Sequence, residues 1–204
     1  MQLIPTQEEV VAVLRETGAL REGHFESPGG LHSNEYLQVP LALRYSQHHR
    51  MLSVGLSRRL RENPEIRAIA SDVSIVTPMT GGLPVAYGVC EALRAKQVYW
   101  AEREHDVEAL HFRQFLEPQE GEQVVLVDDI LRTGKKLSEL KKLLESRGAT
   151  VVGLAVIIYQ PTPQTFDFGN LPLYYLAKLD ARYAVDAAHC EWCRNGEPLV
   201  KVWI

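Results

Sequence analysis

The sequence predicts an α/β fold built on a mainly parallel sheet with helices on both of its faces. Three segments carry near-continuous apolar runs: "VSIVTP" at 73–78, "QVVLVDD" at 123–129 and "TVVGLAVIIY" at 150–159. Runs of this kind are typical of strands that are buried on both faces. The segments between them have helical patterns, and strands that alternate with helices favour a parallel sheet over a sandwich or a bundle.

The N-terminal part begins with two helices. Thr6 and Glu9 have capping-box spacing ahead of an apolar pattern, so the first helix should start near Thr6 and end at Gly18. The turn-rich, then extended segment that follows has Pro28, Gly29 and Gly30 at its centre. A second helix is expected from Ser46, as its N-cap, to about residue 61, where the Asn63-Pro64 pair would end it.

The later elements follow the alternation closely. We expect a helix over "GGLPVAYGVCEALRA", a strand over "QVYWAE" and a helix over "KKLSELKKLLESRG", with a further strand candidate in "LPLYYLAKLD". In the third of these segments Leu137, Leu140, Leu143 and Leu144 share one helical face. Residues 103–121 form a charged connection that is longer than most loops, which suggests a lid or an extra hairpin.

Composition narrows the class of protein. The chain has 204 residues, of which 46% are hydrophobic and 24% charged, and its formal net charge is −4. This is enough chain for one domain with a small appendage, and the charge gives no general attraction for nucleic acid. No apolar run approaches the roughly 20 residues that cross a bilayer. The N-terminus has no signal-peptide pattern and the three cysteines suggest no disulfide framework, so we expect a cytoplasmic protein without a membrane or nucleic-acid partner.

The most informative motif is "VVLVDDILRTGKK", in which a buried strand runs into two carboxylates and then a glycine turn. Ligands of open parallel sheets bind beyond the carboxyl ends of the strands. Asp128 and Asp129 could accept hydrogen bonds from sugar hydroxyls or help to hold Mg²⁺. The backbone around Gly134, the helix N-terminus and Lys135 and Lys136 would attract a phosphate. Together these groups fit a ribose 5-phosphate.

Two commoner phosphate-binding motifs do not match these residues. A Walker loop needs a glycine five residues before Gly134, where the chain has Asp129, and no G-x-G-x-x-G follows any strand. In a purely structural interpretation Asp129 caps a turn and the two lysines begin a solvated helix. The apolar strand before the acids and the Thr-Gly pair after them favour the phosphate site.

The motif and three further segments of the chain resemble a known family. "VVLVDDILRTGKK" is similar to the phosphoribosyl-pyrophosphate (PRPP) signature of type I phosphoribosyltransferases. "GALREGHFESPGGLHSNEYLQ" resembles the N-terminal hood of bacterial orotate phosphoribosyltransferases, "VTPMTGGLPVAYGVCEALRAKQVYWAERE" their pyrophosphate loop, and "CEWCRNGEPLVK" their C-terminal ending. The four matches occur in the family's order over nearly the whole chain.

The resemblance implies an architecture and a set of roles. It implies one domain over 1–204, with a core at about 46–160 and hood segments at about 18–45 and 165–204. Asp128, Asp129 and Arg103 would be the catalytic residues, Arg103 at the start of a mobile loop that reaches a neighbouring subunit. The implied PRPP-binding residues are Asp128, Asp129, Arg132, Thr133, Gly134, Lys135 and Lys136, with Thr80, Gly81 and Gly82 around the pyrophosphate; the base-binding residues are Phe25, His32, Ser33 and Tyr36.

The implied activity is phosphoribosyl transfer from PRPP to orotate, which gives orotidine 5-phosphate in pyrimidine biosynthesis, by a homodimer that uses Mg²⁺. Two features depart from the family pattern. Lys136 stands where a hydroxyl side chain usually ends the phosphate cradle, and the 103–121 segment is acidic, with Asp106 and Glu108 among its residues. A PRPP- or nucleotide-binding paralogue that is regulatory, or that acts on another base, is the alternative.

The C-terminal "HCEWC" could supply three zinc ligands, His189, Cys190 and Cys193. A closed structural site needs four, and Cys90 falls within an expected helix. From the sequence we therefore expect no metal site and a reduced, packed tail.

Overall fold

The computed structural model describes residues 4–105 and 109–202. Its main sheet has five strands in the order β4-β3-β5-β6-β7, and every neighbouring pair is parallel. This confirms the predicted sheet. Its strands are β3 (Ser74–Pro78), β4 (Val98–Ala101), β5 (Gln123–Leu131), β6 (Thr150–Tyr159) and β7 (Leu173–Lys178).

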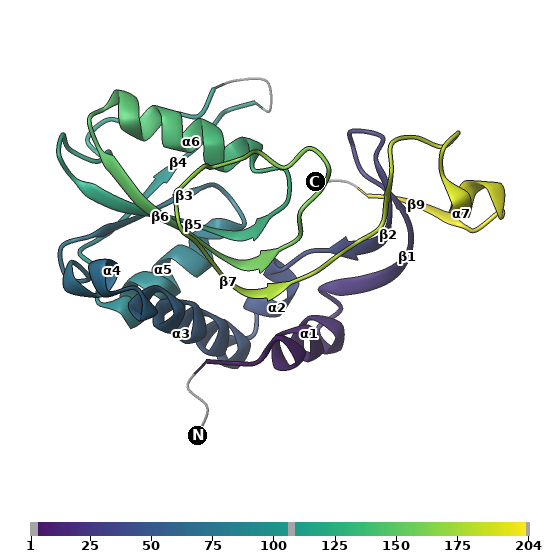
Figure 1. Ribbon diagram of the computed structural model, residues 1–204, viewed down its shortest axis with the longest axis horizontal. Coiled ribbons are helices and arrows are strands. Elements are labelled where there is room, and N and C mark those ends of the chain that lie inside the picture. Colours follow the sequence, from purple (N-terminus) through teal and green to yellow (C-terminus); the bar gives the residue numbers. More distant parts are fainter. Residues whose placement is uncertain (1–3, 106–108, 203–204) are drawn as a thin grey trace.

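Helices cover both faces of this sheet (Figure 1). On β5, Val125 and Val127 join the core cluster beneath the sheet, whereas Val124 and Leu126 join the cluster under α6. This alternation explains why the strands are apolar throughout, since both of their faces are buried. The helices of the domain are α1 (Gln7–Glu16), α2 (Pro40–Leu43), α3 (Ser46–Glu62), α4 (Pro64–Ala68), α5 (Gly82–Leu93) and α6 (Lys135–Ser146).

Local signals set several of the helix boundaries. The Thr6 side chain accepts from the Glu9 N–H and the Glu9 carboxylate accepts from the Thr6 N–H, so the predicted capping box is present. Ser46 is the first residue of α3 and Tyr45 its N-cap, which corrects the expected cap by one position. Asn63 ends α3 and caps α4 through its own side chain.

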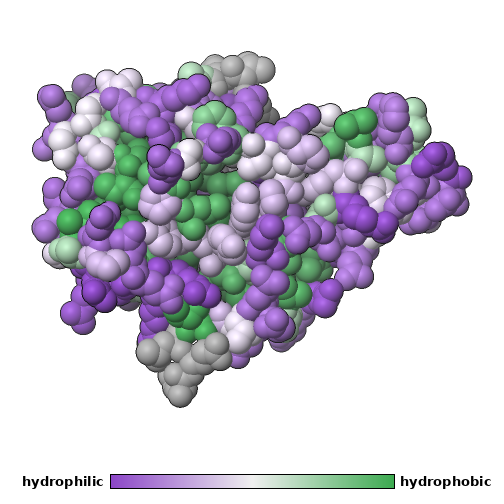
Figure 2. Space-filling model, in the orientation of Figure 1, coloured by the Kyte–Doolittle hydropathy of each residue, from purple (hydrophilic) through white to green (hydrophobic). Residues whose placement is uncertain are grey.

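A second, smaller sheet has four strands in the order β8-β2-β1-β9. It consists of β1 (Leu20–Glu26), β2 (His32–Leu37), β8 (Tyr183–Ala184) and β9 (Leu199–Lys201), and it carries the short helix α7 (Glu191–Arg194). We call this sheet together with α7 the hood. The C-terminal β9 lies beside β1 from the start of the chain, and the hood projects from one side of the body (Figures 1 and 2).

Two expected boundaries need correction. The hood does not begin at about 165, because Leu173–Lys178 pairs with β6 as the fifth strand of the main sheet. The strand that carries the acid pair does not end at Asp129 but continues to Leu131, which pairs with Tyr159 of the longer β6. In the part of the chain that the structure describes, no helix has the length and apolar character to cross a membrane.

Candidate active site

Two loops meet at the carboxyl end of the main sheet. β3 and β5 are neighbours, so the loop from β3 to α5 and the loop from β5 to α6 lie at the same edge. Between them is a cavity of about 330 Å³, in which the acid pair, the glycine turn and the two lysines come together. It is lined by Pro78, Met79, Gly81 and every residue from 128 to 137.

The acid pair is largely withdrawn from solvent. Asp128 is 9% exposed, and its Oδ1 accepts the N–H of Asp129 at 2.9 Å. The Asp129 Oδ1 accepts the N–H of Ile130 at 3.0 Å. Burial raises the pKa of Asp128 well above its ordinary value, and the neighbouring Asp129 charge raises it further. Burial also raises the pKa of Asp129. Hydroxyl donors or a cation in the cavity would therefore stabilise the charged form of both carboxylates.

The β3–α5 loop approaches these carboxylates closely. A Cβ atom at Gly82 would lie 2.1 Å from the Thr77 Oγ1 and 2.7 Å from the Asp128 Oδ1, and one at Gly81 would lie 3.0 Å from the Asp129 Oδ2. Only glycine fits at Gly82 without moving its neighbours. The Met79–Thr80 peptide bond in this loop is cis.

The glycine turn after β5 starts α6 directly beside the acids. Gly134 has φ 71°, and a Cβ there would lie 2.9 Å from the Phe168 ring. Lys135 and Lys136 begin the helix and are among the residues that line the cavity. The Lys136 ammonium is close enough to Asp128 to lower the pKa of that carboxyl against the effect of burial. The two lysines therefore flank the cavity at a helix N-terminus, where an anion is favoured.

Arg132 links this loop to the hood. Its Nε donates to the Gln160 Oε1 at 2.9 Å, and its Nη2 donates to the Leu37 carbonyl at 3.1 Å. Gln160 in turn donates to the Glu35 carboxylate at 3.2 Å. Burial raises the pKa of Tyr183, whereas the Arg132 charge lowers it. Gln160 and Tyr183 are site candidates that sequence reasoning missed, because they join Arg132 only in the folded chain.

The expected base-binding residues divide into two groups. Phe25 and Tyr36 pack with ring centroids 5.7 Å apart, and the Ser33 hydroxyl donates to the Glu35 carbonyl. His32 is 2% exposed, and its Nδ1 lies 2.8 Å from the His24 Nε2 and 3.5 Å from the Cys193 Sγ. Because its ring is enclosed in that cluster, the structure does not support the expected contact of His32 with the base.

The expected lid is tied to α6 at its base. The Arg103 Nη2 lies 2.6 Å from a Glu139 carboxylate oxygen, and the other carboxylate oxygen accepts the Leu110 N–H. Glu102 and His111 form an antiparallel backbone bridge, so these two residues lie side by side. Arg103 is not among the residues that line the cavity, and its catalytic role stays a prediction. Asp106 and Glu108 lie outside the described residues.

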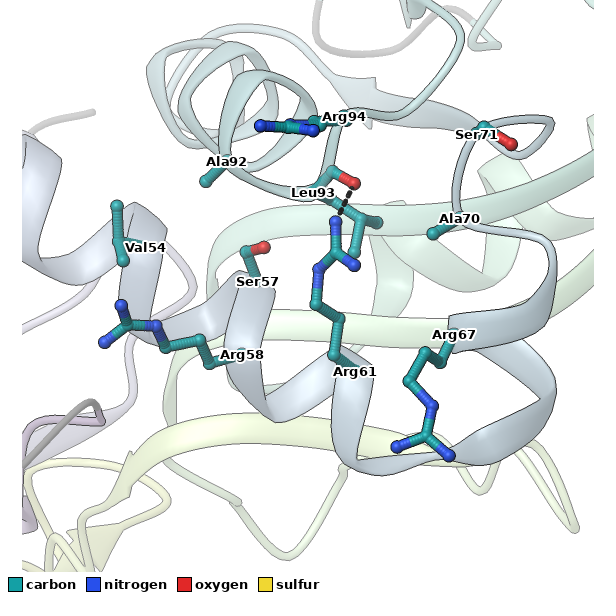
Figure 3. A pocket seen from close by; sticks show the side chains of 10 residues that line it. All are labelled: Val54, Ser57, Arg58, Arg61, Arg67, Ala70, Ser71, Ala92, Leu93 and Arg94. Atoms are coloured by element: carbon teal, nitrogen blue, oxygen red, sulfur yellow. Dashed lines mark hydrogen bonds between the residues drawn. The ribbon is translucent and has the colours of Figure 1, made fainter.

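A larger hollow, of about 610 Å³, lies away from these loops, among α3, α4 and α5 (Figure 3). Four arginines, Arg58, Arg61, Arg67 and Arg94, are among the residues that line it, and Arg61 donates to the Leu93 carbonyl. Its lining residues include no acid and none of the predicted site residues. Size alone therefore does not identify the active site.

Comparison with known proteins agrees with this geometry. The family model described as "Phosphoribosyl transferase domain" matches residues 55–168, which include both loops of the cavity. The chain belongs to the phosphoribosyltransferase family. It is 32% identical to an orotate phosphoribosyltransferase of Pelotomaculum thermopropionicum over 96% of both chains. It is 34% identical to that of Thermotoga maritima over 93% of this chain and 94% of the relative.

The fold of this phosphoribosyltransferase also has solved counterparts. The orotate phosphoribosyltransferase of Aeropyrum pernix superposes with a TM-score of 0.64 at 22% identity, over 83% of this chain and 93% of that one. At such identity the likeness shows the fold alone. The curated relatives extend over the hood as well, which the family match at 55–168 does not reach.

Proposed function

We propose that this chain transfers the phosphoribosyl group of PRPP to orotate, which gives orotidine 5-phosphate and pyrophosphate in pyrimidine biosynthesis. The observation that carries the proposal is the convergence of Asp128, Asp129, Gly81 and Gly134 on one cavity. The chain that contains it aligns over 93–96% of its length with orotate phosphoribosyltransferases. In the reaction the bond from C1 of the ribose to a pyrophosphate oxygen breaks. A bond from C1 to a ring nitrogen of the base forms, and that nitrogen loses its proton.

In this proposal three groups of residues around the cavity bind different parts of PRPP. Asp128 and Asp129 accept hydrogen bonds from the two ribose hydroxyls, which orients C1 toward the base. The N-terminus of α6, with Gly134, Lys135 and Lys136, holds the 5-phosphate. Backbone N–H groups of the Thr80–Gly82 loop face the pyrophosphate and stabilise the charge that develops on it as it leaves.

Magnesium fits this donor set. Two adjacent carboxylates at a cavity wall are the oxygen ligands that Mg²⁺ prefers, usually together with waters and substrate phosphates. Asp128 and Asp129 would hold the ion through water or through the ribose hydroxyls. When bound with PRPP, Mg²⁺ would neutralise charge on the pyrophosphate. Burial raises the pKa of both acids. A bound cation would stabilise their charged forms, which supports this assignment.

Arg132 is the cation that we assign to the carboxylate of orotate. The hood has no arginine or lysine in the "SPGGLHS" turn, whereas Arg132 lines the cavity on the side that contacts the hood. Its two hydrogen bonds use Nε and one terminal nitrogen, and neither contact uses Nη1. The Tyr183 hydroxyl is buried near this guanidinium without a hydrogen-bond partner among the described residues, so it is available to a ligand.

We further propose that the protein acts in the cytoplasm as a homodimer in which Arg103 reaches the partner's site. The ion pair between Arg103 and Glu139 would then be exchanged for contact with pyrophosphate when the 103–121 segment closes. Light scattering after gel filtration should give twice the chain mass of 23.0 kDa. A mass of one chain at assay concentrations would remove this part of the proposal.

Turnover tests the proposal as a whole. Purified protein is mixed with PRPP, Mg²⁺ and either orotate, uracil, adenine or hypoxanthine, and the loss of free base is followed by absorbance. Orotate should be consumed at least tenfold faster than the other bases, in line with a charge-specific contact of about 1.4 kcal/mol or more. Asp129→Asn should abolish turnover, and the exposed Asp167→Asn should leave it unchanged. Consumption of another base in place of orotate would overturn the substrate assignment.

A further inference from the structure

Four metal-binding side chains from distant parts of the chain meet inside the hood. His24 comes from β1, His32 from the start of β2, and Cys190 and Cys193 from the N-cap and body of α7. Their four donor atoms all lie within 4.8 Å of one another. His24, His32 and Cys190 are buried and Cys193 is partly buried. None of the four lines the cavity at the sheet end.

The distances between the donors approach those of a tetrahedral site. With the usual zinc bond lengths, a regular tetrahedron separates two nitrogens by about 3.3 Å, and a nitrogen from a sulfur by about 3.6 Å. The His24 Nε2 lies 3.4 Å from the Cys190 Sγ and 3.6 Å from the Cys193 Sγ. The Cys193 Sγ lies 3.5 Å from the His32 Nδ1. The two ring nitrogens are 2.8 Å apart and would have to separate by roughly half an ångström to admit the ion.

The surroundings of His24 orient it as a ligand. Its Nδ1 lies 3.2 Å from the Glu197 carbonyl oxygen, so the proton belongs on Nδ1 and the lone pair of Nε2 faces the other donors. A ligating histidine usually has its second nitrogen fixed in this way by a carbonyl or a carboxylate. The centroids of the Trp192 and His24 rings are 5.8 Å apart, and the Arg182 guanidinium lies over the Trp192 ring, 5.3 Å from its centroid.

The C-terminal part of the hood has few buried hydrophobic side chains. Among residues 179–202, which the structure describes without a gap, the buried hydrophobic side chains are those of Cys190 and Trp192. β8 has two residues, and all three residues of β9 are exposed. A metal ion that joined β1, β2 and α7 would add a cross-link where burial supplies little stability.

We propose that His24, His32, Cys190 and Cys193 bind one Zn²⁺ ion that fastens the C-terminal segment to the β1–β2 hairpin. Two imidazoles and two thiolates are a donor set that suits zinc. Four protein ligands fill the coordination of the ion, so the site is structural and takes no part in phosphoribosyl transfer. The proposal does not depend on the function proposed above.

This assignment also revises the ligand set that the sequence suggested. "HCEWC" offers His189 next to the cysteines, but the His189 Nδ1 binds the Asp186 carboxylate at 2.8 Å and the residue is exposed. The motif therefore supplies two ligands, and the other two are the histidines of the β1–β2 hairpin. In sequence His24 is 166 residues from Cys190, so no local spacing could have paired them.

Metal analysis of the untagged protein tests the site. Protein purified under reducing conditions from cells grown with added zinc should contain about one zinc ion per chain, as measured by inductively coupled plasma mass spectrometry. Cys190→Ser and His32→Gln should each lower the zinc content about tenfold or more. Cys90→Ser and His189→Gln are the matched controls, and both should retain full zinc. Loss of zinc in the His189 variant with retention in the His32 variant would overturn the proposed ligand set.

Two further measurements keep the test decisive if a ligand variant fails to fold. Cobalt in place of zinc should give the thiolate charge-transfer bands and the tetrahedral visible bands of a two-sulfur site in the unmodified chain. Chelation should raise hydrogen exchange in residues 183–201 and leave β5 and β6 protected. A folded chain that holds less than about a tenth of an equivalent of zinc after reduction and reconstitution overturns the proposal, as does a Cys190–Cys193 disulfide that persists in reductant.

Discussion

The main sheet and the hood sheet are stabilised in different ways. The main sheet has five parallel strands with apolar side chains on both faces, and β5 and β6 are nine and ten residues long. The hood has strands of two to seven residues, and polar side chains meet at its centre. The main sheet can therefore rely on hydrophobic burial, whereas the hood depends on specific polar contacts and on the sheet to which it is joined. Matched substitutions in the two regions should behave differently.

The largest difference is expected between two leucines. Leu126 on β5 is fully buried, and Leu199 on β9 is 39% exposed. Leu126→Ala should lower the free energy of unfolding by about 2–5 kcal/mol, because it removes buried methyl groups and leaves a cavity. Leu199→Ala should change it by less than about 0.5 kcal/mol. Urea unfolding followed by circular dichroism measures both, and equal losses would contradict the contrast between the two sheets.

Arg132 probes the contact between the two regions. Arg132→Met removes the hydrogen bonds to the Gln160 Oε1 and to the Leu37 carbonyl. We expect a loss of about 1–3 kcal/mol in unfolding free energy and a rise in KM for orotate that exceeds the rise in KM for PRPP. The control Arg15→Met breaks an exposed ion pair with Glu22 and should leave both KM values unchanged. Equal effects on the two substrates would show that Arg132 does not select the base.

Asp128 is a buried acid on β5 of the main sheet, next to Asp129. Because burial raises its pKa in the folded chain, the protonated form stabilises the folded state at low pH and that stability is lost as pH rises through the folded pKa. Asp128→Asn should therefore raise Tm at pH 7.5 by roughly 2–6 °C while it abolishes turnover.

The gain from Asp128→Asn should shrink as pH approaches the ordinary carboxyl pKa of 3.8. Thermal melts of the two proteins between pH 4.5 and 8 check the sign. A gain that grows toward low pH would mean that the Asp128 pKa is depressed rather than raised. Asp180→Asn, at an exposed acid of the same kind, serves as the control and should show no such pH dependence.

The smallest effect is expected on the solvent face of α6. Lys141 and Glu145 form an i,i+4 ion pair at the surface, and such pairs contribute about 0.3–0.5 kcal/mol. Lys141→Ala should change Tm by about 1 °C and leave zinc content and turnover unchanged. A large loss would indicate that α6 stability depends on surface charge rather than on Leu137, Leu140 and Leu144.

Local sequence signals predicted the main sheet well because its determinants are local. The apolar period of β3, β5 and β6, the Thr6–Glu9 capping box and the leucine face of α6 all depend on neighbouring residues. The end of β5 was placed two residues early, since Ile130 and Leu131 are held by pairing with β6. That pairing is a long-range contact that the segment itself does not encode.

The sequence predicted the part of the candidate site that lies in short motifs and missed the part that depends on long-range contacts. Asp128, Asp129, Gly81 and Gly134 were predicted because each belongs to a short motif at a strand end, and all four line one cavity. The network of Arg132, Gln160, Glu35 and Tyr183 was missed because its members come from both sheets. His32 was assigned to the base from its place in the hood segment, yet its ring is enclosed with His24 and Cys193.

Binding of PRPP tests the central claim most directly, since it separates the ribose-phosphate cradle from the identity of the base. Calorimetry with PRPP and Mg²⁺ should give micromolar binding to the unmodified chain. Gly134→Val, which forces a β-branched residue into φ 71° against Phe168, should weaken binding at least tenfold, as should Asp129→Asn. Asp167→Asn should bind normally. Undiminished binding by a folded Asp129→Asn and a folded Gly134→Val would contradict the account.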